Sequence, residues 1–178
     1  MTTVPEDQLL TAMREATTPD GVSLEELQRD RTTLVVFLRH SGCPFCREAL
    51  ADVAKNRPAI DARGVQVVLV CQWADGAADH LFDKAGVRDV PRLHDPDGAL
   101  YRAFEIKRGN LWQLFSPWVL LRVIQVSFAG HMAGKAVGDV FQMPGAVLVK
   151  GGRVLHRVRY RSQATRPDYA AAACAVET

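Results

Sequence analysis

The chain has few cysteines and no strong charge bias. Only four of its 178 residues are cysteine, and 22 basic side chains nearly balance 20 acidic ones, which gives a net charge of +2. Four cysteines are too few for a fold held together by disulfides. A nearly neutral chain also gives no electrostatic argument for binding nucleic acid, and we expect no such partner.

The beginning of the chain does not place a basic segment before an apolar one, so a secretory leader is not indicated. We therefore expect a cytoplasmic protein, in which a cysteine pair is catalytic or metal-binding rather than structural. No repeat, low-complexity tract or long linker divides the sequence. Residues 1–178 are expected to form one domain, with a helical extension at 1–22 and a helical insertion at about 106–142.

Two cysteines follow an apolar run directly. Residues 34–38 are apolar and rich in valine, as expected for a strand buried on both faces, and good helix formers follow Cys46. Proline favours the first helical position, so Pro44 places Cys43 at the helix N-cap. There the free backbone N–H groups and the helix dipole favour a thiolate. Cys46 lies in the same first turn, within reach of a disulfide, and the pattern predicts a dithiol redox site.

The residues around the cysteines are further candidates. Arg39 and His40 precede the pair, and a nearby cation lowers a thiol pKa. His40 could also pass a proton to a leaving thiolate or alkoxide. Phe45 lies between the two cysteines and is a candidate substrate contact. The alternative is that a turn after a buried strand needs polar residues for solvation alone.

Metal binding is the alternative use of the cysteine pair. A structural zinc site needs four ligands, whereas Cys71 and Cys174 are isolated and the five histidines form no pair with metal spacing. A second form of metal binding, an iron–sulfur cluster held between two copies of the chain, is not excluded by the sequence. We expect no bound cofactor.

The predicted elements follow the order of a known fold. After the strand and the cysteine helix, residues 65–70 form a second buried strand, which makes a parallel βαβ unit. Strands at 146–149 and 154–160, joined at Gly151 and Gly152, form a late hairpin, and an alanine-rich helix ends the chain. This order resembles the thioredoxin fold, a mixed sheet flanked by helices. That resemblance implies a cis peptide bond before Pro144, close to the cysteines.

Several short segments make the resemblance more specific. They are Ser-Leu-Glu-Glu-Leu from Ser23, Gly-Cys-Pro-Phe-Cys-Arg-Glu from Gly42, His-Asp-Pro-Asp-Gly from His94 and Gln-Met-Pro-Gly-Ala from Gln142. The chain resembles the peroxiredoxin-like branch of the alkyl hydroperoxide reductase and thiol-specific antioxidant superfamily, which includes proteins of the selenoprotein L and prostamide/prostaglandin F synthase types. The resemblance implies an antioxidant oxidoreductase that is reset by an external thiol reductant, such as thioredoxin or a small thiol.

One motif departs from that family. Its typical members carry Pro-x-x-x-Thr-x-x-Cys, whose proline and threonine shape the peroxide pocket. With Cys46 as the reacting cysteine, Cys43 and Arg39 replace the threonine and the proline; with Cys43 as the reacting cysteine, His40 and Val36 replace them. Neither register reproduces the pocket, so the sequence does not indicate fast turnover of hydrogen peroxide.

The stretch 111–128 is unusually apolar. It approaches the length of a membrane-spanning helix, but Gln113, Pro117 and Arg122 interrupt it, and we expect no span. On one continuous helix a stripe would form from Trp112, Phe115, Trp118 and Leu121, which follow one another at helical spacing. Trp112 and Trp118 of this stripe are candidate substrate-binding residues. Three alternatives stay open: extra core on the sheet, a homodimer interface, and the wall of an apolar substrate pocket or a membrane-surface contact.

The sequence thus predicts a thiol oxidoreductase that reduces a peroxide, an endoperoxide or a disulfide. The thiolate of Cys43 or Cys46 attacks an O–O or S–S bond, and the other cysteine resolves the intermediate. The N-cap argument favours Cys43 as the attacking residue. The rival functions are a protein-disulfide reductant of the thioredoxin type and a binding scaffold without catalysis.

Overall fold

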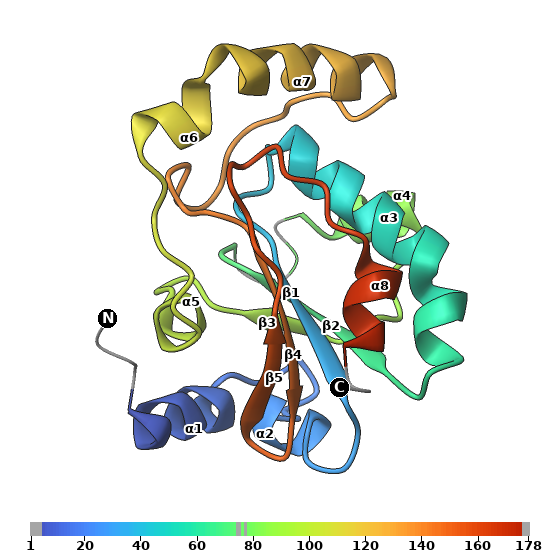
Figure 1. The fold of residues 1–178 in the computed structure, drawn as a ribbon, viewed down its shortest axis with the longest axis vertical. Coiled ribbons are helices and arrows are strands. Elements are labelled where there is room, and N and C mark those ends of the chain that lie inside the picture. The colour runs from blue at the N-terminus through green and yellow to red at the C-terminus, as the bar shows by residue number, and fades with distance from the viewer. Residues whose placement is uncertain (1–4, 74–75, 77, 176–178) are drawn as a thin grey trace.

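The computed structural model describes residues 5–73, 76 and 78–175, and its centre is a mixed five-stranded sheet in the order β3-β2-β1-β4-β5 (Figure 1). β1 is parallel to β2 and antiparallel to β4, as a βαβ unit followed by a hairpin requires. The strands are β1 (Thr33–Phe37), β2 (Gln66–Cys71), β3 (Arg92–His94), β4 (Gly145–Lys150) and β5 (Arg153–Arg157).

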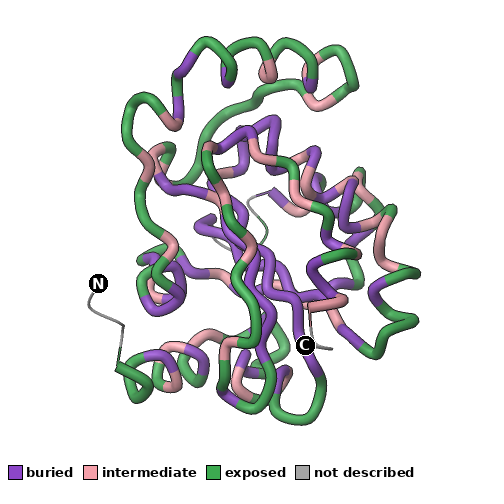
Figure 2. The backbone as a smooth tube through the Cα atoms, viewed as in Figure 1, coloured by how far each residue is buried: buried purple, intermediate pink, exposed green. Residues whose placement is uncertain are grey.

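Helices cover both faces of this sheet. Side chains alternate along β1, so that Leu34 and Val36 face one core and Val35 and Phe37 face the other. The first core lies under α3 (Pro44–Asp61), α4 (Asp79–Ala85) and α8 (Tyr169–Cys174), and the second lies under α1 (Glu6–Glu15), α2 (Leu24–Leu27) and α5 (Ala99–Ala103). In Figure 2 β1, β2 and β4 are buried along most of their length, whereas the edge strand β5 is largely exposed. The expected thioredoxin-like fold is therefore confirmed.

Two local signals form as the sequence indicates. Cys43 is the N-cap of α3 and Pro44 is its first residue, so the cysteine pair lies where β1 passes into the helix. Ser23 and Glu26 make a reciprocal capping box at the start of α2. Each of these signals depends on neighbouring residues alone.

A proline usually ends a helix, but α3 contains Pro58 and continues to Asp61. Proline removes only one backbone hydrogen bond, and here it lies in the last turns of the helix. Ile60, beyond the proline, is fully buried in the core, and Arg57 pairs with Asp61 at 3.5 Å. These contacts outweigh the missing bond.

The prediction of a cis bond before Pro144 is also wrong: this peptide bond is trans. The chain enters β4 in an extended form, held by the N–H of Met143, which donates to the carbonyl of Lys107 at 3.3 Å. A bridge between Arg108 and Gln142 fixes the same approach. Since a tertiary amide itself prefers trans by about 0.5–1 kcal/mol, nothing in this local structure demands the cis form.

The insertion forms two helices instead of one. Ser116 caps a new helix and Pro117 occupies its first position, so the stretch 111–128 divides into α6 (Leu111–Phe115) and α7 (Pro117–Phe128). Val119 and Val126 are buried in the main core, so one side of the stretch adds to the core as that alternative expects. Most of the other large apolar side chains of these helices are exposed, so extra core does not account for the whole stretch. In Figure 1 both helices lie at the upper end of the molecule, beyond the start of α3. Among the described residues, no helix has both the length and the apolar character to cross a membrane.

Candidate active site

The two cysteines of the motif lie together inside the protein. Cys43 is completely buried and Cys46 is nearly so, and both are reduced. The two side chains are close enough for each to change the pKa of the other. The sulfur of Cys46 accepts a hydrogen bond from the backbone N–H of Arg39, at 3.2 Å. The pair is thus arranged to share one proton, and it is close enough for the exchange between thiol and disulfide.

Arg39 is the cation that the sequence places beside the pair, and it is buried. Its Nη1 lies 3.2 Å from the sulfur of Cys43 and also donates to the side-chain oxygen of Gln163. Its Nε donates to the carbonyl of Gln142 at 2.6 Å, and its Nη2 donates to the carbonyl of Val140. These acceptors fix the guanidinium, so its charge is held against one sulfur.

This arrangement separates the pKa values of the two thiols. Burial raises the pKa of Cys43, but the hydrogen bond from Cys46 and the charge of Arg39 outweigh it and bring the pKa to about 6. Burial also raises the pKa of Cys46, and there the bond to Cys43 and the charge on Cys43 raise it further. Near neutral pH the pair therefore holds a thiolate at Cys43 and a thiol at Cys46.

His40 lies at the edge of the site as a neutral side chain. Burial and the charge of Arg39 lower its pKa to about 4, although Asp139 acts in the opposite direction. Its Nδ1 is buried and has no hydrogen-bond partner. His40 therefore supplies no positive charge to the thiolate near neutral pH. It also holds no extra proton there for a leaving group.

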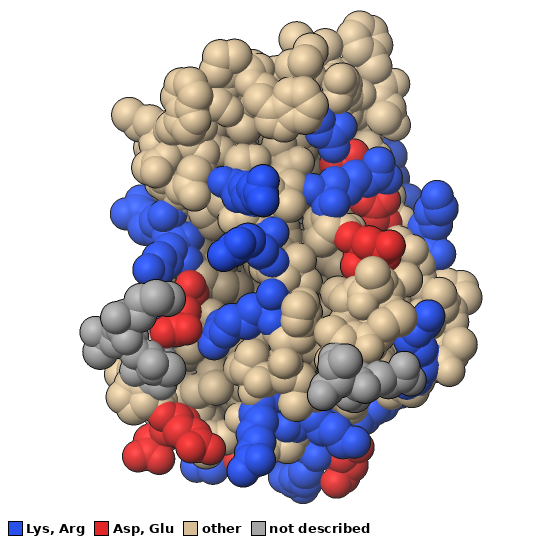
Figure 3. Space-filling view, viewed as in Figure 1, with Lys and Arg blue, Asp and Glu red and all other residues tan. Residues whose placement is uncertain are grey.

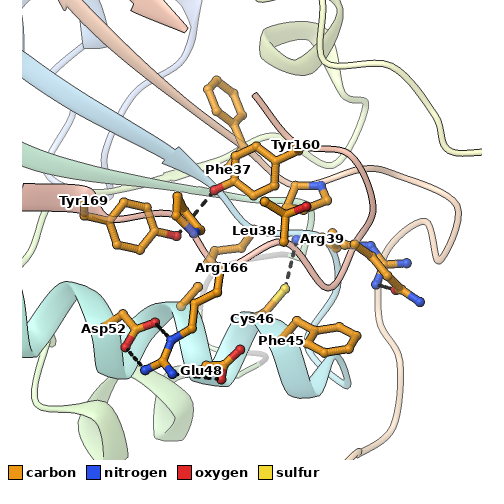
Figure 4. Close-up of a pocket in the computed structure, with 15 residues that line it drawn as sticks. Phe37, Leu38, Arg39, Phe45, Cys46, Glu48, Asp52, Tyr160, Arg166 and Tyr169 are labelled. Carbon is orange, nitrogen blue, oxygen red and sulfur yellow. Dashed lines mark hydrogen bonds and ion pairs between the residues drawn. The ribbon is translucent and has the colours of Figure 1, made fainter. Parts of the chain in front are cut away.

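A small pocket opens beside Cys46. It is lined by Arg39, Phe45, Cys46 and Pro144, so that four of the candidate site residues meet there (Figure 4). Its volume is about 20 Å³, and about 10–15 Å³ is what one water molecule requires. The pocket therefore accepts a group of about the size of a peroxide oxygen, and a bulkier substrate does not fit in this conformation.

One wall of this pocket is ionic. Asp52 holds Arg166 through two hydrogen bonds of 2.6 and 2.7 Å, and Glu48 pairs with Arg122 at 2.9 Å. The two carboxylates lie one turn apart on α3, and Figure 4 shows Glu48, Asp52 and Arg166 together below Cys46. Since each carboxylate has its own arginine, this wall presents compensated charge to the pocket.

The segment 134–142 packs against the turn 39–42 that leads into Cys43, a contact that the sequence did not predict. The hydroxyl of Ser41 donates to the carbonyl of Lys135 and accepts from the N–H of Val137, each at 3.0 Å. A Cβ on Gly42 would collide with the backbone of Gly134, so only glycine allows this approach. Gly42 and Gly134 are local signals for such a close approach. Gln142 and Gln163 lie more than 100 residues from Arg39, and no spacing in the sequence links them to it.

The structure does not bring Trp112 and Trp118 to the cysteines. Their side chains are 74% and 60% exposed and line a separate surface groove with Pro117 and Arg161. Cys71 lies in the core with its sulfur 3.4 Å from a ring nitrogen of His94. In the part of the chain that the structure describes, no group of three or more His, Cys, Asp or Glu residues is placed to hold a metal.

Similar proteins support the same chemistry. The chain is 26% identical over 155 residues to a prostamide/prostaglandin F synthase of Salmo salar, which covers 84% of this chain and 76% of the relative. It is 27% identical over 110 residues to the chloroplastic thioredoxin-like protein AAED1 of Arabidopsis thaliana, covering 62% of this chain. Only 44% of that plant protein is spanned.

Solved structures share the fold. Peroxiredoxin Q of Xanthomonas campestris superposes with a TM-score of 0.63 at 20% identity, over 93% of this chain and 91% of that one. Peroxidoxin BcpB of Mycobacterium tuberculosis gives a TM-score of 0.60 at 16% identity, over 90% and 88% of the two chains.

A family profile identifies the chain. The profile described as AhpC/TSA antioxidant enzyme matches residues 52–162. The match begins after both cysteines of the motif, so their roles rest on the geometry above. It covers β2 through β5 and more than half of the sequence. The chain therefore belongs to the AhpC/TSA antioxidant enzyme family and is a thiol-dependent oxidoreductase with the thioredoxin-like fold.

Proposed function

We propose that the protein reduces a small hydroperoxide, with Cys43 as the attacking thiolate and Cys46 as the resolving thiol. The observation that carries this proposal is the Arg39 guanidinium, whose Nη1 lies 3.2 Å from the sulfur of Cys43. A buried thiolate needs a fixed positive charge close by, and Arg39 supplies it. The thiolate is the reactive form of cysteine, so the residue with the lowered pKa is the nucleophile.

The reaction uses both cysteines in turn. The Cys43 thiolate attacks one peroxide oxygen, the O–O bond breaks, and the leaving alkoxide or hydroxide takes up a proton to give an alcohol or water. Cys43 is then a sulfenic acid. The Cys46 thiol attacks its sulfur, water leaves, and a disulfide joins the two residues. Two thiol groups of an external reductant then reduce this disulfide to the free thiols of Cys43 and Cys46, and the reductant is itself oxidised to a disulfide.

The small volume of the pocket and the burial of Cys43 favour a small substrate. The pocket beside Cys46 has a volume of about 20 Å³ and is not lined by Cys43, which is completely buried. Any substrate therefore reaches Cys43 only when the neighbouring segment 134–142 moves, and a small substrate needs the least movement. The sequenced relatives are named for prostamide and prostaglandin F synthesis, and a lipid of that size would require a larger movement of this segment. A protein disulfide needs an open groove around the attacking sulfur, and Cys43 is completely buried. These observations support a hydroperoxide over a protein disulfide.

The remaining proposals concern the reductant and the location. We propose that a dithiol protein such as thioredoxin, or a small thiol, resets the disulfide, and that no bound cofactor takes part. A reducing compartment such as the cytoplasm would supply these thiols and keep the four cysteines reduced.

Trapping experiments test the assignment. The reduced protein is treated with one equivalent of hydrogen peroxide or a small organic hydroperoxide and mapped by mass spectrometry. The unchanged protein should yield a Cys43–Cys46 disulfide, whereas Cys46→Ser should accumulate a sulfenic acid at Cys43 that dimedone traps. Cys174→Ser serves as the matched control and should behave like the unchanged protein. A sulfenic acid at Cys46 in the Cys43→Ser variant, formed at the normal rate, would reverse the two roles.

A further inference from the structure

The helices α6 and α7 leave a large apolar surface uncovered. We call this surface the apolar cap. In Figure 2 its backbone is largely exposed, and in Figure 3 it forms the uncharged upper end of the molecule. Exposed apolar patches of this extent mark interaction sites. The cap consists of Leu111, Trp112, Phe115, Trp118, Leu120, Leu121, Ile124, Phe128 and Met132.

The helix α7 is apolar on two opposite sides. Val119 and Val126 are buried in the main core. Leu120, Ile124 and Phe128 repeat every four residues on an exposed face, and Phe128 is 89% exposed. A surface helix of a globular protein normally carries polar residues on its outer face, so this outer face is suited to a partner rather than to water.

Charge indicates the kind of partner. Residues 106–138 contain no aspartate or glutamate, but they contain Lys107, Arg108, Arg122 and Lys135. Figure 3 shows a belt of lysine and arginine directly below the cap. Arg157, at the end of β5, and Arg159 and Arg161, which follow it, are also exposed. The nearest acidic groups are engaged: Asp139 pairs with Arg108 at 2.7 Å, and Glu48 and Asp52 pair with Arg122 and Arg166.

We propose that the apolar cap inserts into the surface of an anionic phospholipid membrane. Aliphatic and tryptophan side chains enter the boundary between headgroups and acyl chains, and the basic belt meets the lipid phosphates and acidic headgroups. A symmetric dimer through the cap would instead bring two basic belts together, and their like charges would repel. This docking is independent of the peroxide chemistry. It directs the end of α3 that carries the cysteines toward the membrane (Figure 1).

Vesicle binding by the full chain tests the proposal. Vesicles of phosphatidylcholine with phosphatidylserine are compared with vesicles of phosphatidylcholine alone by co-sedimentation. Tryptophan fluorescence gives a second reading, because Trp73 is buried while Trp112 and Trp118 lie on the cap. We expect binding to the anionic vesicles with a blue shift of emission. Replacing Lys107 by glutamine should weaken binding about fivefold, as expected for about 1 kcal/mol per basic residue. The same replacement of Arg108 should have a smaller effect, because Asp139 already compensates its charge.

Variants separate the possible occupants. Ile124→Glu with Phe128→Glu should abolish binding, since both side chains are exposed and the fold should be kept, as circular dichroism can verify. Val22→Glu, at an exposed apolar position before α2, is the matched control and should bind normally. Equal binding to neutral vesicles, or binding that survives the double substitution, would overturn the proposal. If the protein does not bind vesicles but forms a dimer that the double substitution abolishes, the cap is the contact with a second copy of the chain. If the protein neither binds vesicles nor dimerises, the cap is not a docking surface.

Discussion

The turn before α3 and the helices α6 and α7 distribute polar and apolar groups in opposite ways. At the turn a charged side chain is inside: Arg39 is 3% exposed and donates to three carbonyl groups of the protein. On α7 an aromatic side chain is outside: Phe128 is 89% exposed. Both arrangements cost free energy in an isolated protein. The first is compensated within the chain, and the second requires a partner.

The insertion 106–142 contributes to both regions. Its last part, residues 134–142, supplies the backbone groups that pack against the turn 39–42 and hold Arg39. Its helical part carries the exposed apolar side chains and does not line the pocket beside Cys46. The difference shows that one inserted segment can complete an active site and also present a docking surface. Substitutions in each part should therefore affect different properties.

Arg39→Gln should have the largest effect, because it removes a buried cation and leaves several buried acceptors without a donor. We expect a loss of about 3–5 kcal/mol in the free energy of unfolding. The pKa of Cys43 should rise toward the ordinary value of about 8.5, and its alkylation near neutral pH should slow at least about tenfold. Denaturant unfolding and iodoacetamide kinetics measure both.

Arg57→Gln is the control for that substitution. Arg57 pairs with Asp61 and Asp89 at the surface, and its loss should cost less than about 1 kcal/mol and leave the alkylation of Cys43 unchanged. If Arg39→Gln lowered the free energy of unfolding by no more than Arg57→Gln does, the hydrogen bonds of the buried Arg39 would not stabilise the protein as we describe.

The pH dependence of stability should show the next largest effect. The pKa of Cys43 is lowered to about 6 in the folded state, whereas a thiol in the unfolded chain titrates near about 8.5. Between these values the unfolded state holds a proton that the folded state has released, so stability rises with pH and is lost as pH falls toward 6. The free energy of unfolding of the reduced protein, minus that of Cys43→Ser, should grow by up to about 1.4 kcal/mol per pH unit across this window. A difference that stays constant with pH would contradict the lowered pKa.

Ser41→Ala should have a smaller effect, on access to Cys43. Its hydroxyl makes two hydrogen bonds to the segment 134–142, and their loss should cost about 1–2 kcal/mol. Movement of this segment should become more frequent, so the plateau rate of Cys43 alkylation at high pH should rise severalfold. Ser127→Ala is the matched control, because that hydroxyl bonds only within α7, to the carbonyl of Val123 at 2.8 Å. If Cys43 were alkylated at the same rate in the unchanged protein, Ser41→Ala and Ser127→Ala, residues 134–142 would not limit the access of the reagent to Cys43.

Phe128→Glu should have the smallest effect on catalysis. The side chain is exposed and far from the pocket of Cys46, so turnover of a small soluble peroxide should stay within about twofold of the normal rate. Steady-state assays without vesicles measure this. A large loss would show that the cap and the active site are coupled, and the separation of the two regions would fail.

The site was predictable from the sequence only where its signals are local. Residues 34–46 carry the strand, the helix-starting proline and the cysteine pair, and the structure places Cys43 at the N-cap as expected. The break before α7 was also encoded locally, because Ser116 followed by Pro117 is a typical helix start. Pro117 by itself indicated an interruption of the apolar stretch, and only together with Ser116 does it mark the start of a second helix.

The remaining features depend on contacts between distant segments. The partners of Arg39 are Val140, Gln142 and Gln163, and no motif connects them to it. The exposure of the apolar cap could not be predicted either. Apolar residues at helical spacing have the same pattern whether their helix faces the core or the solvent, and only the folded chain shows which face is covered.

The pH dependence of alkylation in the reduced, unchanged protein tests the central claim most directly, which is that Arg39 and Cys46 activate Cys43. The protein is treated with iodoacetamide over a range of pH values, and tandem mass spectrometry assigns the label to Cys43 or Cys46. We predict a midpoint near pH 6 for Cys43, while Cys46 stays unlabelled until well above the ordinary thiol range. A midpoint for Cys43 near the ordinary value of about 8.5, or earlier labelling of Cys46, would contradict the account.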